Sequence, residues 1–176
     1  MNPATTSPVV EGQWTLLDPE ATEVQVEVVI GTDVVESARL PYAPWAAWSS
    51  SSDLPFDELV VLRVASIDAD GDQSAFASRT VRTPPEPVRA LTATPSVWSV
   101  QLSWPAAQAT SYRVRVTNQA THETSWDDTE GSPTTVSGLQ QDVPYAFEVY
   151  SVDAFGQLST VPSPTAFATP VGIGAG

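Results

Sequence analysis

The stretch Val64-Ala-Ser-Ile-Asp-Ala-Asp-Gly71 recurs almost letter for letter as Val149-Tyr-Ser-Val-Asp-Ala-Phe-Gly156. Leu54 and Leu139 match at the same offset, so the repeat extends well beyond the quoted residues. The matching residues are 85 positions apart. A repeat of 85 residues is a whole small domain, since the units of solenoid proteins are only about 20 to 45 residues long. The sequence therefore predicts two domains, at residues 1–84 and 85–170, followed by a flexible Gly-rich tail at 171–176.

Apolar residues alternate with polar ones in short runs along the chain, as is typical of strands with one buried face. Turn signals such as Asp70-Gly71 and Gly131-Ser-Pro133 separate the runs, and no run shows the 3.6-residue period of a helix. We therefore expect an all-β protein made of two antiparallel β-sandwiches in tandem. The clearest alternating sets are Val24, Val26 and Val28; Val60, Leu62 and Val64; Tyr112, Val114 and Val116; and Tyr145, Phe147 and Val149.

The second copy resembles the fibronectin type III domain, an immunoglobulin-like β-sandwich, over about Pro87 to Thr169. Leu139 followed by Tyr145 is similar to the tyrosine corner, in which the Tyr hydroxyl bonds to upstream backbone. The resemblance implies that these side chains, with those of the two central strands, form the core of the sandwich. The expected core residues are Trp104, Tyr112, Leu139, Tyr145 and Phe147.

The first copy departs from this pattern in its core. Asp18 lies where Trp104 would fall, and Val60 takes the place of Tyr145. These losses predict a hole in the first core, which nearby aromatic side chains could fill. The candidates are Trp14, Trp45 and Trp48.

The first strand of the first copy is also expected to be weak or missing. Among residues 1–10, Val9 and Val10 are the large apolar candidates for such a strand. A missing edge strand would leave unpaired backbone that a neighbouring protein could cover.

Composition narrows the choice of partners. The net charge of −14 disfavours binding to phosphate backbones and to anionic membranes, and no apolar run approaches the roughly 18 residues of a membrane span. The chain has no cysteine, so no disulfide is expected. Its first residues lack both a basic and an apolar segment, so we expect no signal peptide.

Catalytic and metal-binding motifs find little support, and we expect a protein that is not an enzyme and has no cofactor. His122, the single histidine, lies in a polar stretch typical of an exposed loop, and no nucleophile motif accompanies it. Asp68, Asp70 and Asp72 superficially resemble a calcium loop, but Gly71 comes too early for an EF-hand. We favour an acidic turn there, with calcium binding as the alternative.

Aromatic residues outside the expected core are the best functional lead. Tyr42, Trp45 and Trp48 lie in a Pro-rich segment, and Trp126 precedes an acidic pair. Flat aromatic faces stack on sugars or bury into protein partners. The alternative, which we favour for Trp45 and Trp48, is that they cover the core of the first domain; Trp126 is the more exposed candidate.

Three classes of function remain. The first is a structural virion component of a bacteriophage, in the tail, baseplate or capsid surface, because modules that resemble fibronectin type III domains are common on tailed phages. Its partners would be other virion proteins or sister subunits in a homo-oligomeric assembly, with a host-surface glycan as a further ligand. The second is a carbohydrate-associated binding or spacer module of a secreted bacterial enzyme system. The third, a receptor fragment of metazoan type, fits least because lysine is absent.

Overall fold

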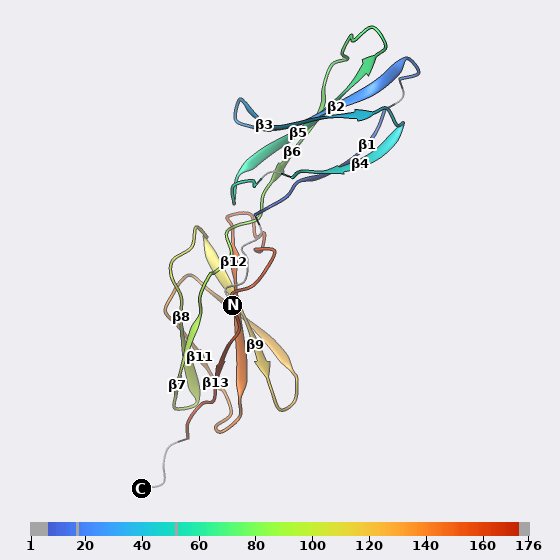
Figure 1. Cartoon of the computed structure of the whole chain (residues 1–176). Helices are drawn as coiled ribbons and strands as arrows, with labels where there is room; N and C mark the ends of the chain where they lie inside the picture. The colour runs from blue at the N-terminus through green and yellow to red at the C-terminus, as the bar shows by residue number, and fades with distance from the viewer. Residues whose placement is uncertain (1–6, 17, 52, 173–176) are drawn as a thin grey trace. The chain divides into compact units, whose positions relative to one another are not determined.

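The computed structural model describes residues 7–16, 18–51 and 53–172, and the chain divides between Thr83 and Pro84 into two compact units. We call them the N-terminal unit and the C-terminal unit (Figure 1). Within the described residues every regular element is a strand and no helix occurs. The prediction of an all-β chain built from sandwiches in tandem is confirmed. Of residues 1–10, where a weak or missing first strand is predicted, the described residues 7–10 form no strand, although they contain Val9 and Val10. Residues 1–6, like the predicted tail from 173 to 176, lie outside the described residues.

The N-terminal unit pairs a four-stranded sheet with a two-stranded one. The larger sheet has the order β3-β2-β5-β6, and the smaller consists of β1 and β4, all antiparallel. The strands are β1 (Glu11–Thr15), β2 (Ala21–Ile30), β3 (Asp33–Pro41), β4 (Trp45–Ser49), β5 (Leu59–Asp68) and β6 (Ala77–Arg82).

The C-terminal unit pairs a four-stranded sheet with a three-stranded one. The larger sheet has the order β10-β9-β12-β13, and the smaller has the order β11-β8-β7. The strands are β7 (Thr92–Ser96), β8 (Ser99–Ser103), β9 (Ser111–Asn118), β10 (Thr124–Thr129), β11 (Thr134–Ser137), β12 (Tyr145–Val152) and β13 (Ala166–Ala168).

The two units share one strand order, and they differ by one strand. The larger sheets correspond strand for strand, and the pair β1-β4 corresponds to the pair β8-β11. β7 covers the outer edge of β8, whereas no strand among the described residues covers the outer edge of β1. β1 thus occupies the place of a second strand.

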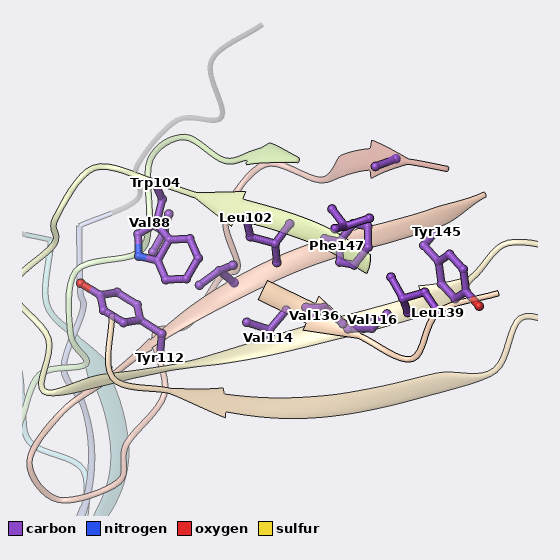
Figure 2. Packing of buried hydrophobic residues seen from close by; sticks show 13 residues of the cluster. Val88, Leu102, Trp104, Tyr112, Val114, Val116, Val136, Leu139, Tyr145 and Phe147 are labelled. Carbon is purple, nitrogen blue, oxygen red and sulfur yellow. The ribbon is translucent and has the colours of Figure 1, made fainter. Parts of the chain in front are cut away.

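The core of the C-terminal unit collects side chains from both sheets and from the segment that precedes β7 (Figure 2). Phe147, Leu102 and Val100 are fully buried at its centre. At one end the ring of Trp104 lies edge-on to Tyr112, with 5.1 Å between centroids. The five core residues named from the sequence, Trp104, Tyr112, Leu139, Tyr145 and Phe147, are all buried.

Tyrosine hydroxyls tie loops to the sandwich in both units. Tyr145 accepts a hydrogen bond from the backbone N–H of Gln140 at 3.1 Å, which is the geometry of a tyrosine corner. Tyr112 bonds to both backbone groups of Ala107 in the loop between β8 and β9. Tyr42 also fixes a loop to the sandwich, in the N-terminal unit: its hydroxyl donates to Leu16 O at 2.8 Å and accepts from Asp18 N at 3.1 Å.

The repeated stretch forms the same turn in both units. The Asp68 side chain accepts hydrogen bonds from the N–H groups of Asp70 and Asp72, through its Oδ1 atom. Asp153 Oδ1 bonds the N–H groups of Phe155 and Gln157 in the same way. The first aspartate of each copy therefore closes an Asx turn after the central strand.

Candidate interaction site

A groove of about 780 Å³ opens in the N-terminal unit between β1 of the smaller sheet and β6 of the larger one. Its apolar floor includes Trp14, Leu62, Val64 and Val81, and Arg79 and Glu11 lie at its rim. Trp14 belongs only partly to the core, and its Nε1 atom is buried without a hydrogen-bond partner among the described residues. The groove thus borders the core of the N-terminal unit along one side.

One wall of the groove is the edge of β1 that no strand among the described residues covers. Leu16 N donates to Pro44 O at 3.0 Å, and Ser50 N donates to Val10 O at 2.9 Å, so even-numbered positions turn their backbone groups toward β4. In an antiparallel ladder the intervening residues face the opposite way. The backbone groups that face away from β4 and border the groove belong to Glu11, Gln13 and Thr15.

A glycine shapes the floor of the groove. Gly12 lies on the inward face of β1, and a Cβ at this position would collide with the Leu62 side chain. Glycine therefore lets Leu62 pack directly against the strand. The sequence analysis missed this contact, because Gly12 and Leu62 are distant in the chain; an inward-facing glycine in an alternating strand was the available signal.

The aromatic residues of the segment around β4 do not form one surface. Tyr42 and Trp48 pack against the core of the N-terminal unit, whereas the Trp45 side chain is 65% exposed. Trp45 and Trp48 are three residues apart in one strand, and side chains alternate between faces with a period of two. The interpretation that both cover the core is therefore wrong for Trp45, and of this trio Trp45 is the residue available to a partner.

Trp126 lies on the outer face of the larger sheet of the C-terminal unit. Its ring is 49% exposed, 5.8 Å from the Tyr150 ring and 6.0 Å from the Arg115 guanidinium. Cross-strand ion pairs join Arg115 to Glu148 and Arg113 to Asp128 on the same face. We call these six residues the outer patch: Arg113, Arg115, Trp126, Asp128, Glu148 and Tyr150.

Two carboxylates have shifted pKa values. The Ser66 hydroxyl, which donates to Asp18 at 2.5 Å, lowers the pKa of the Asp18 carboxyl, and the Glu20 N–H adds to the effect. The hydrogen bond from Arg113, together with the charge of Arg113, lowers the pKa of the Asp128 carboxyl. The hydrogen bond to Asp128 and the charge of its carboxylate in turn raise the pKa of Arg113. Both carboxylates act in structural contacts, and neither lines the groove.

The structure places His122 in the turn between β9 and β10, where its side chain is exposed and its φ is 62°. Its backbone N–H donates to Asn118 O. In the part of the chain that the structure describes, no group of three or more His, Cys, Asp or Glu side chains is arranged to hold a metal ion. Likewise, none of the described residues forms a helix long and apolar enough to cross a membrane.

No protein-family model matches the chain, and no curated protein matches it in sequence. Several solved structures are similar in fold. A two-domain fibronectin type III segment of chicken tenascin is 14% identical and has a TM-score of 0.49, and the match covers 94% of each chain. The FN5 domain of Drosophila Lar is 21% identical, with a TM-score of 0.43 over 51% of this chain and 99% of that one.

A third similar structure is the FN1–FN3 segment of chicken CNTN1, which is 14% identical with a TM-score of 0.46. The match covers 94% of this chain and 64% of that segment. The strand order and the tyrosine corner of the structure itself give the class: two immunoglobulin-like β-sandwiches in tandem.

Proposed function

We propose that the protein is a non-catalytic structural component of a bacteriophage virion, in the tail, baseplate or capsid surface. In this proposal the N-terminal unit docks onto another virion protein or a sister subunit, and the C-terminal unit projects from the particle. The observation that carries the docking role is the unfinished sandwich of the N-terminal unit, with a free edge on β1 beside an apolar groove. Exposed edges and grooves of this kind are sites of strand addition.

The difference between the units supports the division of roles. The C-terminal unit has a third strand on its smaller sheet, and the segment of β7 adds Ala93 to its core. The charge of −14 is compatible with docking on neutral or basic protein surfaces and disfavours nucleic acid. The virion setting rests on the habit of such modules in tailed phages.

Particle incorporation tests the proposal. Particles purified by density gradient from a host that produces the encoding phage should carry the chain, detected by immunogold labelling. A chain truncated to residues 84–176 should stay folded, shown by the far-ultraviolet circular dichroism of a β protein, and should be absent from particles. Incorporation of the truncated chain at the level of the full chain would exclude docking by the N-terminal unit, and absence of the full chain from particles would exclude the virion role.

The outer patch favours a second candidate function, contact with a glycan. Trp126 offers a half-exposed ring flanked by charged side chains that hydrogen-bond well to hydroxyls. Such a contact suits either a host-surface glycan or a carbohydrate-associated module of a secreted bacterial enzyme system. Co-sedimentation with insoluble polysaccharides, such as chitin and peptidoglycan, should fall in Trp126→Ala and remain unchanged in Trp45→Ala, which removes a more exposed ring elsewhere. Equal retention of the two variants would contradict a glycan site at Trp126.

A further inference from the structure

The C-terminal unit indicates what fits the groove of the N-terminal unit. β7 pairs antiparallel with β8, the counterpart of β1. Leu91 and Ala93, two residues apart, turn their side chains against the core, and the preceding Val88 is buried. The matching occupant of the groove is therefore an extended segment with a large and then a small apolar side chain at alternate positions.

The chain contains a second segment with this pattern, Val171-Gly-Ile-Gly-Ala-Gly176. Its apolar residues stand at every second position, and the intervening positions are all glycine. Ile173 and Ala175 repeat the order and the spacing of Leu91 and Ala93. A strand of this sequence has one apolar face and one face without side chains, as suits insertion between a free edge and a core.

We propose that residues 172–176 of one copy insert into the N-terminal groove of a second copy and add a strand antiparallel to β1. In the register of β7 on β8, Gly174 lies opposite Thr15 and Gly176 opposite Gln13, so the backbone groups of these two β1 residues form the hydrogen bonds of the added strand. The Ile173 and Ala175 side chains fill the groove over Trp14 and Leu62. This proposal rests on the proposed docking role of the N-terminal unit and names its partner, a second copy of this chain.

The anchoring of Val171 favours a second copy over the same copy. Val171 N donates to Ser96 O, and Trp98 N donates to Val171 O, so this residue is held at the turn between β7 and β8. Two residues of fully extended chain span at most about 7 Å, which limits how far from this anchor an added strand can begin. That turn is at the end of β7 away from Pro84, where the N-terminal unit is joined, so the segment starts on the far side of its own unit (Figure 1).

Residues 7–10, the described residues before β1, form no strand on the outer edge of β1. Val10 is buried and bonded to Ser50 through both its N–H and its C=O, so the chain continues along β4. A hairpin like the one before β8 uses a left-handed φ, seen at Trp98, and Val10 does not adopt one. Val9 and Val10 are β-branched, which disfavours such a turn.

The contact joins unlike surfaces of the two copies, the tail segment of one and the groove of the other. Such a heterologous contact repeats from copy to copy and produces an open chain or a closed ring. Because each copy carries a charge of −14 and the inserted segment has no charged side chain, added salt should strengthen the association by screening repulsion.

Sedimentation velocity of the full chain over a wide concentration range is the first test. Wild type should form dimers and higher species, and Ile173→Ser should shift its association to at least tenfold higher concentration. Gly174→Ser is the matched control, because it introduces the same side chain on the opposite face of the segment. A wild-type chain that stays monomeric throughout would overturn the proposal, as would equal behaviour of the two variants.

Proline scanning of the two edges of the smaller sheet tests the receiving side. Gln13→Pro removes an N–H that faces away from β4, so it should abolish association and leave the β1–β4 ladder intact. Ala47→Pro, directly opposite on the outer edge of β4, is the control and should associate like wild type. If Gln13→Pro abolishes particle incorporation while Ile173→Ser does not, docking by the groove stands and residues 172–176 are excluded as the strand that it receives.

Because the chain has no cysteine, a disulfide in a variant can form only between the introduced cysteines. Under mild oxidation, a mixture of the single variants Thr15→Cys and Gly174→Cys should form a mixed disulfide dimer, identified by mass spectrometry after non-reducing electrophoresis. Gly174→Cys with Glu20→Cys, an exposed position outside the groove, is the control and should give far less. An internal disulfide in the monomeric double variant, with no mixed dimer, would overturn insertion into a second copy.

Discussion

The two units have the same sandwich architecture but different numbers of strands in the smaller sheet. In the C-terminal unit, β7 closes the smaller sheet, and Phe147 is fully buried behind it. In the N-terminal unit, no described strand covers the matching edge, and Leu62, at the position of Phe147 in the repeat, lines a groove. One fold thus yields a closed module and an unfinished one, and the open edge rather than any single side chain makes the difference.

Truncation of the central core residue of each unit is the strongest way to break this comparison. Phe147→Ala should destabilise the C-terminal unit by about 3–5 kcal/mol, since a fully buried aromatic side chain leaves a closed cavity. Leu62→Ala should cost the N-terminal unit about 2 kcal/mol, at the low end for a buried leucine, because one side already borders the groove. Hydrogen exchange followed by mass spectrometry reports each unit separately during denaturant titration. An equal or larger loss in Leu62→Ala would contradict the difference in closure.

Removal of the tying hydroxyls sharpens the comparison at the loops. Tyr42→Phe should destabilise the N-terminal unit by about 1–2 kcal/mol, because Leu16 O and Asp18 N both lose a partner. Tyr112→Phe should cost the C-terminal unit about 1 kcal/mol, since its two bonds to Ala107 are longer, at 3.2 and 3.3 Å. Denaturant midpoints measured by the same exchange method check the order. A Tyr42→Phe variant as stable as wild type would show that its loop is held by other contacts.

Most of the fold could be predicted from the sequence, because the signals are local. The period of two defines strands such as β2, β9 and β12, and the spacing from Leu139 to Tyr145 indicates a tyrosine corner. The internal repeat then extends the assignment to the N-terminal unit without further information. Each of these patterns lies within one strand or one turn.

The candidate site could be predicted only in outline. A weak first strand predicts an open edge, but the groove depends on Gly12 meeting Leu62, a contact between distant segments. The opposite exposures of Trp45 and Trp48 follow from their odd spacing once both are placed in one strand. Their Pro-rich surroundings carry no clear strand signal, so the sequence alone does not separate the two residues.

Asp68 and Asp153 close the same turn in the two units, and substitution of each tests whether the turn contributes equally to the stability of both. Asp153 is buried and Oδ1 bonds two N–H groups at 2.8 Å, so Asp153→Ala should cost about 1–2 kcal/mol. Asp68 makes the same two bonds in a more exposed turn, and Asp68→Ala should cost about 0.5–1 kcal/mol. Thermal unfolding compared with the matched Asn variants, which keep the acceptor oxygen, measures the hydrogen bonds. Equal losses in the Ala and Asn variants would contradict a role for the acceptor.

Acid unfolding gives the smallest expected difference between the units and separates two causes of a lowered pKa. The Ser66 hydroxyl lowers the pKa of Asp18, so its folded value lies below the unfolded value of about 3.9. A carboxylate of this kind contributes stability above about pH 3.9 that is lost as pH falls through the folded pKa. Asp18→Asn should therefore make the stability of the N-terminal unit less steep in this acid range and leave the C-terminal unit unchanged. Asp128→Asn, which removes the carboxylate paired with Arg113, should show the reverse assignment. Denaturant titrations by hydrogen exchange at several pH values below 5 measure both slopes, and an unchanged slope for the N-terminal unit in Asp18→Asn would assign its acid response to other carboxylates.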